Sequence, residues 1–176
     1  MNKYEHILKG GDLRSIGNVS AIIKSVKDQD DFDELYKGLF NPDRKVIMRT
    51  ADAIEKITLA EPSFLQKHKK ELLQLCQTAK EIELKWHLAL LVSRFQLNKK
   101  ELGIIWHCLT QWATDKKESK IVRVNAVQSL SKLISLQPEL MHDFNLTLSE
   151  IEKENVPSIN ARIRKIRKAD NKRNPG

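Results

Sequence analysis

A spacing of 38 residues recurs three times along the chain and restricts the folds open to it. Segments that begin at Val46, Leu84 and Val122 align at this step, and each carries its apolar side chains at i, i+4, i+7, i+8 and i+11. These positions lie on one face of an α-helix, so the chain is predicted to contain the same helix three times. Thirteen of the fifteen aligned positions are apolar, although only 40% of all residues are hydrophobic. The aligned columns are Val46/Leu84/Val122, Thr50/Leu88/Ala126, Ala53/Leu91/Ser129, Ile54/Val92/Leu130 and Ile57/Phe95/Leu133.

A second apolar stripe follows each repeated helix, which predicts three helical hairpins. Pro62 and Pro138 stand where the second helix of a hairpin should begin, and Asn41-Pro42 and Asn98 with Glu101 are typical of helix N-caps. A hairpin of this size cannot bury its apolar face alone, so neighbouring hairpins must stack into one core. The second stripes are Leu65, Leu72, Cys76 and Ala79; Leu102, Ile105, Leu109 and Trp112; and Leu140, Phe144, Leu148 and Ile151.

The two ends of the chain predict less regular helices. Gly10-Gly11 predicts a turn, and a terminal helix is expected over Ser158–Ala169, preceded by Val156-Pro157. Residues 1–170 are interpreted as a single domain and 171–176 as a frayed tail. The fold class is therefore an all-α, right-handed α-α superhelix of about four hairpins plus a basic terminal helix. The inward side chains at the ends are Val19, Ile22, Ile23 and Val26; Phe32, Leu35, Tyr36, Leu39 and Phe40; and Ile159, Ile163 and Ile166.

Residues 122–130, VRVNAVQSL, resemble the V-R-x-x-A-x-x-x-L pattern of HEAT repeats, and LKWHLALLV from Leu84 is a looser copy. Tetratricopeptide repeats fit less well, because their pattern places Leu-Gly where Ala89-Leu90 follows Trp86. From about Gly10 to Ala169 the chain is similar to a bacterial family of small HEAT-repeat proteins without an assigned activity. This resemblance implies an armadillo-like fold and does not indicate a ligand. The stretches that carry it are GGDLRSIGNVSAII, MRTADAIEKIT, KWHLALLVSRF, IVRVNAVQSLSKL and SINARIRKI.

The net charge of +8 is concentrated at the C-terminus, because residues 157–176 alone carry +6. The body of the chain is nearly neutral, which argues against a surface built throughout for nucleic acid. The longest apolar run, Leu88–Val92, is too short to span a membrane, and the first twelve residues lack the apolar core of a signal peptide. Cys76 and Cys108 lie within apolar stripes and are interpreted as buried thiols. A cytoplasmic protein is expected.

Candidate binding residues come from the polar positions of the repeated helices, which are expected to line a concave surface. The column Lys56/Arg94/Lys132 is basic in all three repeats and would form a ladder of cations, or simply a solvated lysine face. Trp86 and Leu90 would form an apolar patch for a partner if exposed, and the alternative places Trp86 in the core. The remaining candidates on this surface are Arg49, His87 and Asn125.

The basic terminal helix has three interpretations. In the first, it serves only as the polar cap that closes a stack of repeats; in the second, it also binds nucleic acid or an acidic protein. Membrane docking ranks last, because its isoleucine stripe lacks Trp, Phe and Leu. Its candidate side chains are Arg162, Arg164, Lys165, Arg167 and Lys168.

Motifs that would carry catalysis are not found in the sequence. It contains no zinc-binding CxxC or HExxH, no glycine-rich phosphate loop and no nucleophile elbow, so no catalytic residue, metal or cofactor is predicted. The leading hypothesis is a non-catalytic module that binds a protein or peptide. The alternative is a nucleic-acid-binding protein that uses the ladder and the terminal helix. A third hypothesis, an alkylpurine DNA glycosylase, lacks a carboxylate one turn after Trp86 or Trp106.

Overall fold

A computed structural model of the chain describes residues 3–9 and 19–173, with side chains up to Asp170. All secondary structure in these ranges is helical, so the predicted all-α class is confirmed. The turn predicted at Gly10-Gly11 lies outside the described residues. The chain packs as two compact units, Met1–Glu71 and Leu72–Gly176, and a single domain over residues 1–170 stays a prediction.

Unit 1 is organised around its longest helix, α4 (Arg44–Ala60), which contacts every other helix that lies wholly within the unit. Its N-cap is Asp43, whose side chain accepts a hydrogen bond from the Lys45 amide. The N-cap predicted at Asn41 is therefore wrong by two residues; Asn41 instead accepts from the Asp43 amide at 2.9 Å. The other helices are α1 (Glu5–Lys9), α2 (Val19–Ser25), α3 (Gln29–Tyr36), η1 (Lys37–Phe40) and η2 (Pro62–His68), and α5 (Lys69–Thr78) leads into unit 2.

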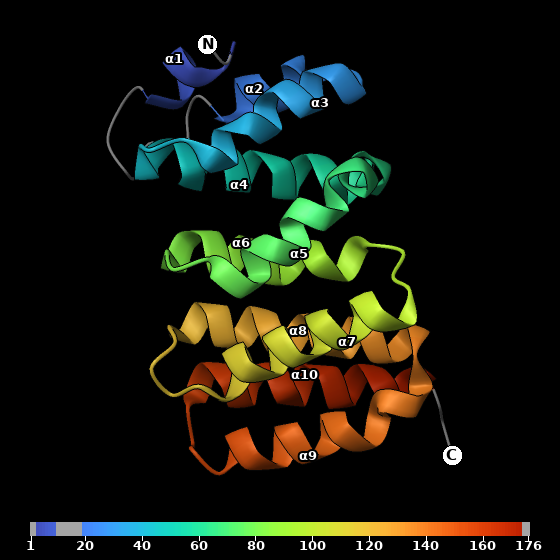
Figure 1. The fold of residues 1–176 in the computed structure, drawn as a ribbon. Coiled ribbons are helices and arrows are strands. Elements are labelled where there is room, and N and C mark those ends of the chain that lie inside the picture. The colour runs from blue at the N-terminus through green and yellow to red at the C-terminus, as the bar shows by residue number, and fades with distance from the viewer. Residues whose placement is uncertain (1–2, 10–18, 174–176) are drawn as a thin grey trace. The chain divides into compact units, whose positions relative to one another are not determined.

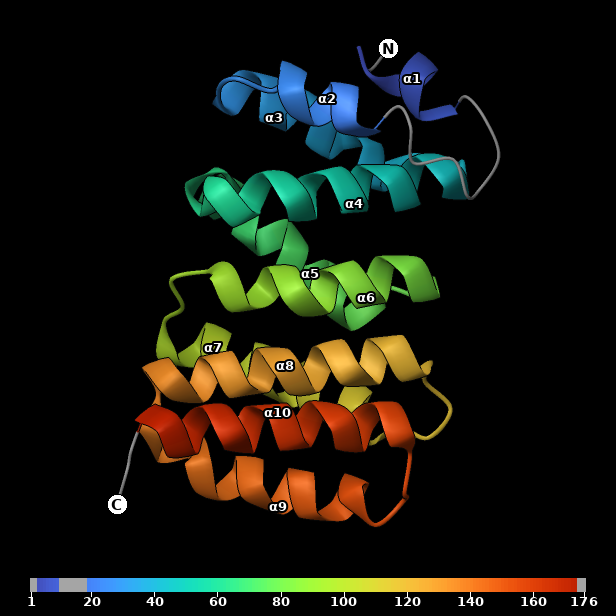
Figure 2. The same ribbon diagram turned by 180° about the vertical axis from the view of Figure 1, so that it is seen from behind.

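Unit 2 has two layers of helices (Figure 1; Figure 2 from behind). One layer holds α6 (Ile82–Leu91) with η3 (Val92–Arg94), α8 (Lys120–Leu136) and α10 (Pro157–Arg173). The other layer holds α7 (Lys99–Thr114) and α9 (Met141–Glu152), and η4 (Pro138–Leu140) precedes α9. Because α8 contacts α6, α7, α9 and α10, it is the central helix of the unit.

The aligned columns form the cores of the two units. All fifteen side chains are buried, including the polar pair Thr50 and Ser129, so the prediction from the 38-residue spacing is confirmed. In unit 2 the columns extend into α10, because Ile159, Ile163 and Ile166 follow the first three α8 columns at a step of 37 residues and are also buried. The terminal helix therefore repeats the first three positions of the buried face, and it contacts α8 as α8 contacts α6.

The helix boundaries follow local sequence signals. Asn98 and Glu101 form the predicted capping box, and Pro62 and Pro138 begin η2 and η4. The expected start of the terminal helix is confirmed within one residue, while α10 continues to Arg173, three residues into the segment predicted as a tail. One inward prediction fails in unit 1: Phe40 is 56% exposed, because the chain turns away after η1.

Gly38 of η1 lies close against α4 in unit 1. A Cβ atom at this position would lie 2.3 Å from Thr50 Oγ1 of α4, closer than van der Waals contact allows. Gly103, in contrast, lies on the exposed surface of α7, within the helix, and a Cβ atom there would meet no other atom within 4 Å.

Replacing these two glycines should change stability in opposite directions. Gly38→Ala should lower the free energy of unfolding by about 1–3 kcal/mol through overpacking. Gly103→Ala should raise it by about 0.5–1 kcal/mol, because alanine favours a helix interior over glycine. Urea unfolding followed by circular dichroism measures both. A Gly38→Ala protein as stable as the parent would contradict the packing, whereas partial rescue by a second change, Thr50→Ala, would support it.

Candidate functional site

A groove between α8 and α10 brings together three of the predicted binding residues. Lys132 of α8 faces Arg162 and Lys165 of α10 across a groove of about 270 Å³ in unit 2. Lys132 and Lys165 are exposed, and Arg162 is half-buried. The other lining residues are Gln128, Ser131 and Ser135 from α8, and Ile166, Ala169 and Asp170 from α10.

Hydrogen bonds between neighbouring helices fix the polar side chains of this layer. Arg162 Nη1 donates to Gln128 Oε1 at 2.5 Å, which joins α10 to α8. One repeat earlier, Asn125 Nδ2 donates to the Trp86 carbonyl oxygen at 3.0 Å and joins α8 to α6. Asn125 and Arg162 occupy the same column at the 37-residue step, so a side chain at this position contacts the preceding helix in both repeats.

The cations of α10 do not form one surface. Arg167 makes a two-pronged ion pair with Glu152 of α9, with both nitrogen–oxygen distances at 2.9 Å. At 100° per residue, Arg164 lies on the same flank of the helix as Arg167, whereas Arg162 and Lys165 lie on the flank toward α8. Lys168 points away from the core and is exposed, as is Arg164. The groove therefore uses only two of the five predicted α10 cations.

Two predicted surface residues are buried, and their assignment to a binding surface is wrong. Arg49 is 4% exposed and donates from Nη1 to the Leu8 carbonyl oxygen of α1 at 2.5 Å. His87 is 5% exposed, with the Trp86 ring packed edge-on at 5.2 Å between ring centroids. Both follow a first-column residue by three positions, which places them only about 60° from it on the helix. Their column therefore belongs to the edge of the buried stripe.

The basic ladder is divided between the two units. Lys56 lies in unit 1, is exposed and forms an ion pair with Asp52 at 2.7 Å. Arg94 and Lys132 lie in unit 2, on adjacent helices of one layer, where Arg94 is half-buried. A ladder of three cations stays a prediction. Trp86 and Leu90 are both half-buried. This exposure lies between that of an exposed patch and that of core residues, the two interpretations given for them.

Ion pairs across the repeats of unit 2 were not predicted. Lys85 of α6 pairs with Glu118, and 38 residues later Arg123 of α8 pairs with Glu154. Arg123 is 3% exposed; its two terminal nitrogens contact Glu154 at 2.9 and 3.0 Å, and its Nε donates to the Ala113 carbonyl oxygen at 2.9 Å. The repeated basic position was visible in the alignment. The acidic partners, Glu118 and Glu154, each lie in the loop before the next repeated helix. No periodic pattern of apolar residues predicts a structural role for a residue there.

Removing the buried cation should lower the free energy of unfolding far more than removing an exposed one. Arg123→Gln should lower the free energy of unfolding by about 3 kcal/mol, because Glu154 loses its partner in a largely buried setting. The matched change Arg167→Gln breaks an exposed pair and should cost less than about 1 kcal/mol. Chemical denaturation of both variants provides the comparison. Equal losses would refute the assigned role of Arg123.

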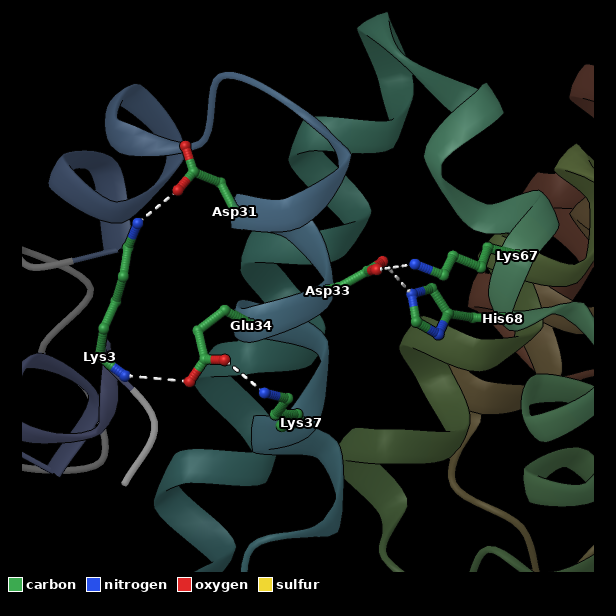
Figure 3. A network of polar contacts seen from close by, with 7 residues as sticks. All are labelled: Lys3, Asp31, Asp33, Glu34, Lys37, Lys67 and His68. Atoms are coloured by element: carbon green, nitrogen blue, oxygen red, sulfur yellow. Dashed lines mark hydrogen bonds and ion pairs between the residues drawn. The ribbon is translucent and has the colours of Figure 1, made fainter.

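Several cations of unit 1 contact carboxylates (Figure 3). Asp33 accepts from Lys67, from Gln29 at 2.7 Å and contacts His68 Nε2 at 2.7 Å, and the His68 ring stacks on Tyr36. Burial would raise the pKa of Asp33, but the Lys67, Gln29 and His68 contacts outweigh it and lower the pKa from 3.8 to about 2. This network binds α3 to η2 and leaves its cations matched by acids.

The depressed pKa of Asp33 predicts acid sensitivity of unit 1. Because the folded pKa lies below the unfolded one, the stabilisation is complete above about pH 4 and is lost as the pH falls toward 2. Asp33→Asn should therefore lower stability at neutral pH by up to about 2 kcal/mol and flatten its pH dependence between 4 and 2. Urea titrations at several pH values measure this. The exposed carboxylate variant Asp143→Asn is the control, and an equal effect there would contradict the network.

A larger, more open groove of about 740 Å³ follows α7 in unit 2. Cys76 and Cys108 lie in its wall, and both are buried as predicted. Cys108 Sγ donates to the Cys76 carbonyl oxygen at 3.1 Å. The contact with the Cys108 thiol and burial raise the pKa of the Cys76 thiol, so Cys76 remains protonated near neutral pH.

Residues 3–9 and 19–170 contain no group of three His, Cys, Asp or Glu side chains placed to hold a metal ion. Within the described helices, none combines the length and the apolar character needed to cross a bilayer.

Stacked helical hairpins with a repeated apolar face define a helical repeat protein. A family model for a HEAT repeat domain matches residues 12–170, nearly the whole chain, and the protein belongs to this HEAT-repeat family. No curated protein matches the chain, and no solved structure does.

Proposed function

We propose that the chain is a non-catalytic module that holds a protein or peptide partner on the α6–α8–α10 face of unit 2. The observation that supports this function is the pair of hydrogen bonds between neighbouring helices, from Asn125 to Trp86 and from Arg162 to Gln128. Side chains already fixed in the free protein lose less conformational entropy when a partner binds. Membership of the HEAT-repeat family agrees with a role in protein interaction.

The same face offers both polar and apolar contacts. Half-buried Trp86 and Leu90 lie on α6, beside the polar side chains of α8. Partly exposed aromatic side chains that are surrounded by fixed polar groups supply much of the binding energy in protein interfaces.

Nucleic acid is the second candidate partner, because residues 157–176 carry a net charge of +6. Such a function would use Lys56, Arg94, Lys132 and the α10 cations. Binding to phosphates releases counterions, so affinity for DNA or RNA should fall steeply between about 50 and 200 mM salt. Ion pairs already occupy Lys56 and Arg167, which favours a protein partner.

Site-specific photo-crosslinking tests the proposed face. A photoreactive amino acid at Ser131, on α8 in the groove, should yield crosslinked protein in a native lysate. The same group at Asn145, exposed on α9 in the other layer, is the matched control and should yield much less. Equal crosslinking from both positions would argue against the face. Nuclease-sensitive products from Ser131 would instead assign it to nucleic acid.

A further inference from the structure

We infer that the groove between α8 and α10 binds an acidic, extended segment of the partner, whose Asp or Glu carboxylates contact Arg162 and Lys165. This inference rests on the proposed function, since it names the chemistry of the segment that the face receives.

Cations that lie between the helices of unit 2 differ in the groups that hold them. Elsewhere in unit 2, Lys85, Arg123 and Arg167 each contact a carboxylate. Arg162 is held instead by the neutral amide of Gln128, and no carboxylate among residues 3–9 and 19–170 forms an ion pair with Arg162 or Lys165. Arg162 and Lys165 therefore keep positive charge with which no carboxylate of the described residues pairs, and Asp170 is the one acid among the described residues that line the groove.

The geometry of the Arg162 donors suits a carboxylate ligand. A guanidinium carries five N–H donors, and the contact with Gln128 uses only part of this set while it fixes the orientation of the plane. A carboxylate can then form the two-pronged contact that arginine favours. One turn along α10, Lys165 adds a flexible cation, and Lys132 adds another from the opposite wall. Acidic side chains at alternate positions of an extended peptide can reach these groups in turn.

The size and the lining of the groove suit a few peptide side chains. Ile166, 5% exposed, gives the groove an aliphatic floor, and the exposed Ala169 adds a methyl group to the lining, so the methylene groups of Glu side chains can pack there. Its volume of about 270 Å³ accommodates a few side chains of a peptide.

The same lining disfavours nucleic acid. Among the described residues that line the groove none is aromatic, so they offer no platform on which bases stack. The Asp170 carboxylate would repel a continuous phosphate backbone, whereas a peptide can place a neutral residue opposite it.

Fluorescence anisotropy with defined probes tests the inference on the full chain. The probes are labelled peptides of alternating Glu and Ala, the matching Lys and Ala peptide, and a labelled single-stranded DNA at the same ionic strength. The Glu peptide should bind, the Lys peptide should not, and the DNA should bind more weakly. Arg162→Gln with Lys165→Gln should weaken Glu-peptide binding by about tenfold or more, because two charge-assisted contacts are lost.

The control is Arg164→Gln with Lys168→Gln, which removes the same charge from the same helix outside the groove. It should change the affinity by no more than about twofold, the scale of a screened surface charge. Circular dichroism melting should show that both double variants fold, because Ile159, Ile163 and Ile166 are unchanged.

Three results would overturn the inference: no binding of the Glu peptide, equal loss in both double variants, or tighter binding of DNA that the groove variant abolishes. The proposed function is tested separately by crosslinking from Ser131. Protein crosslinks there without Glu-peptide binding would reject the acidic segment and retain the protein-binding face. If neither protein crosslinks from Ser131 nor Glu-peptide binding is observed, the protein-binding face and the acidic segment are both rejected.

Discussion

The buried columns at the 38-residue step are the constraint on which the rest of the structure depends. Each repeated helix has one apolar face that water would otherwise solvate, and it buries this face only when further helices pack beside it. Fifteen side chains meet this requirement, from α4, from α6 and η3 with the following residue Phe95, and from α8, and α10 continues the pattern in unit 2. Since this face is fixed, the positions left for a partner are fixed as well.

The residues at the edges of the buried faces divide into two kinds. Some stabilise the stack: Arg123 bridges Ala113 and Glu154, and Arg49 satisfies a carbonyl group of α1. Others orient the surface, as Asn125 and Arg162 do through contacts with the preceding helix. In unit 2, carboxylates neutralise the cations of the first kind, whereas an amide holds Arg162. This difference in partners is the basis for the proposed role of Arg162 in ligand binding.

Sequence reasoning predicted the features that local physics decides. The helices, the capping box at Asn98 and the buried columns all follow from spacing along one helix. Arg49 and His87 were misplaced, because the buried arc of a helix packed on several neighbours is wider than its apolar stripe. The Arg123–Glu154 pair was missed, because it joins residues distant in sequence. Lys132, Arg162 and Lys165 were each named as candidates, but only the packing of α10 on α8 shows that they share one groove.

Chemical-shift mapping tests the central claim, that stacking of the repeats creates a prepared anionic-peptide groove between α8 and α10. Backbone amide spectra of the ¹⁵N-labelled protein would be recorded during titration with the alternating Glu and Ala peptide. We expect shift changes concentrated at residues 128–135 and 162–169, with the α7 and α9 amides nearly unchanged. Changes centred on α7, α9 or unit 1, with residues 128–135 and 162–169 unaffected, would contradict the account.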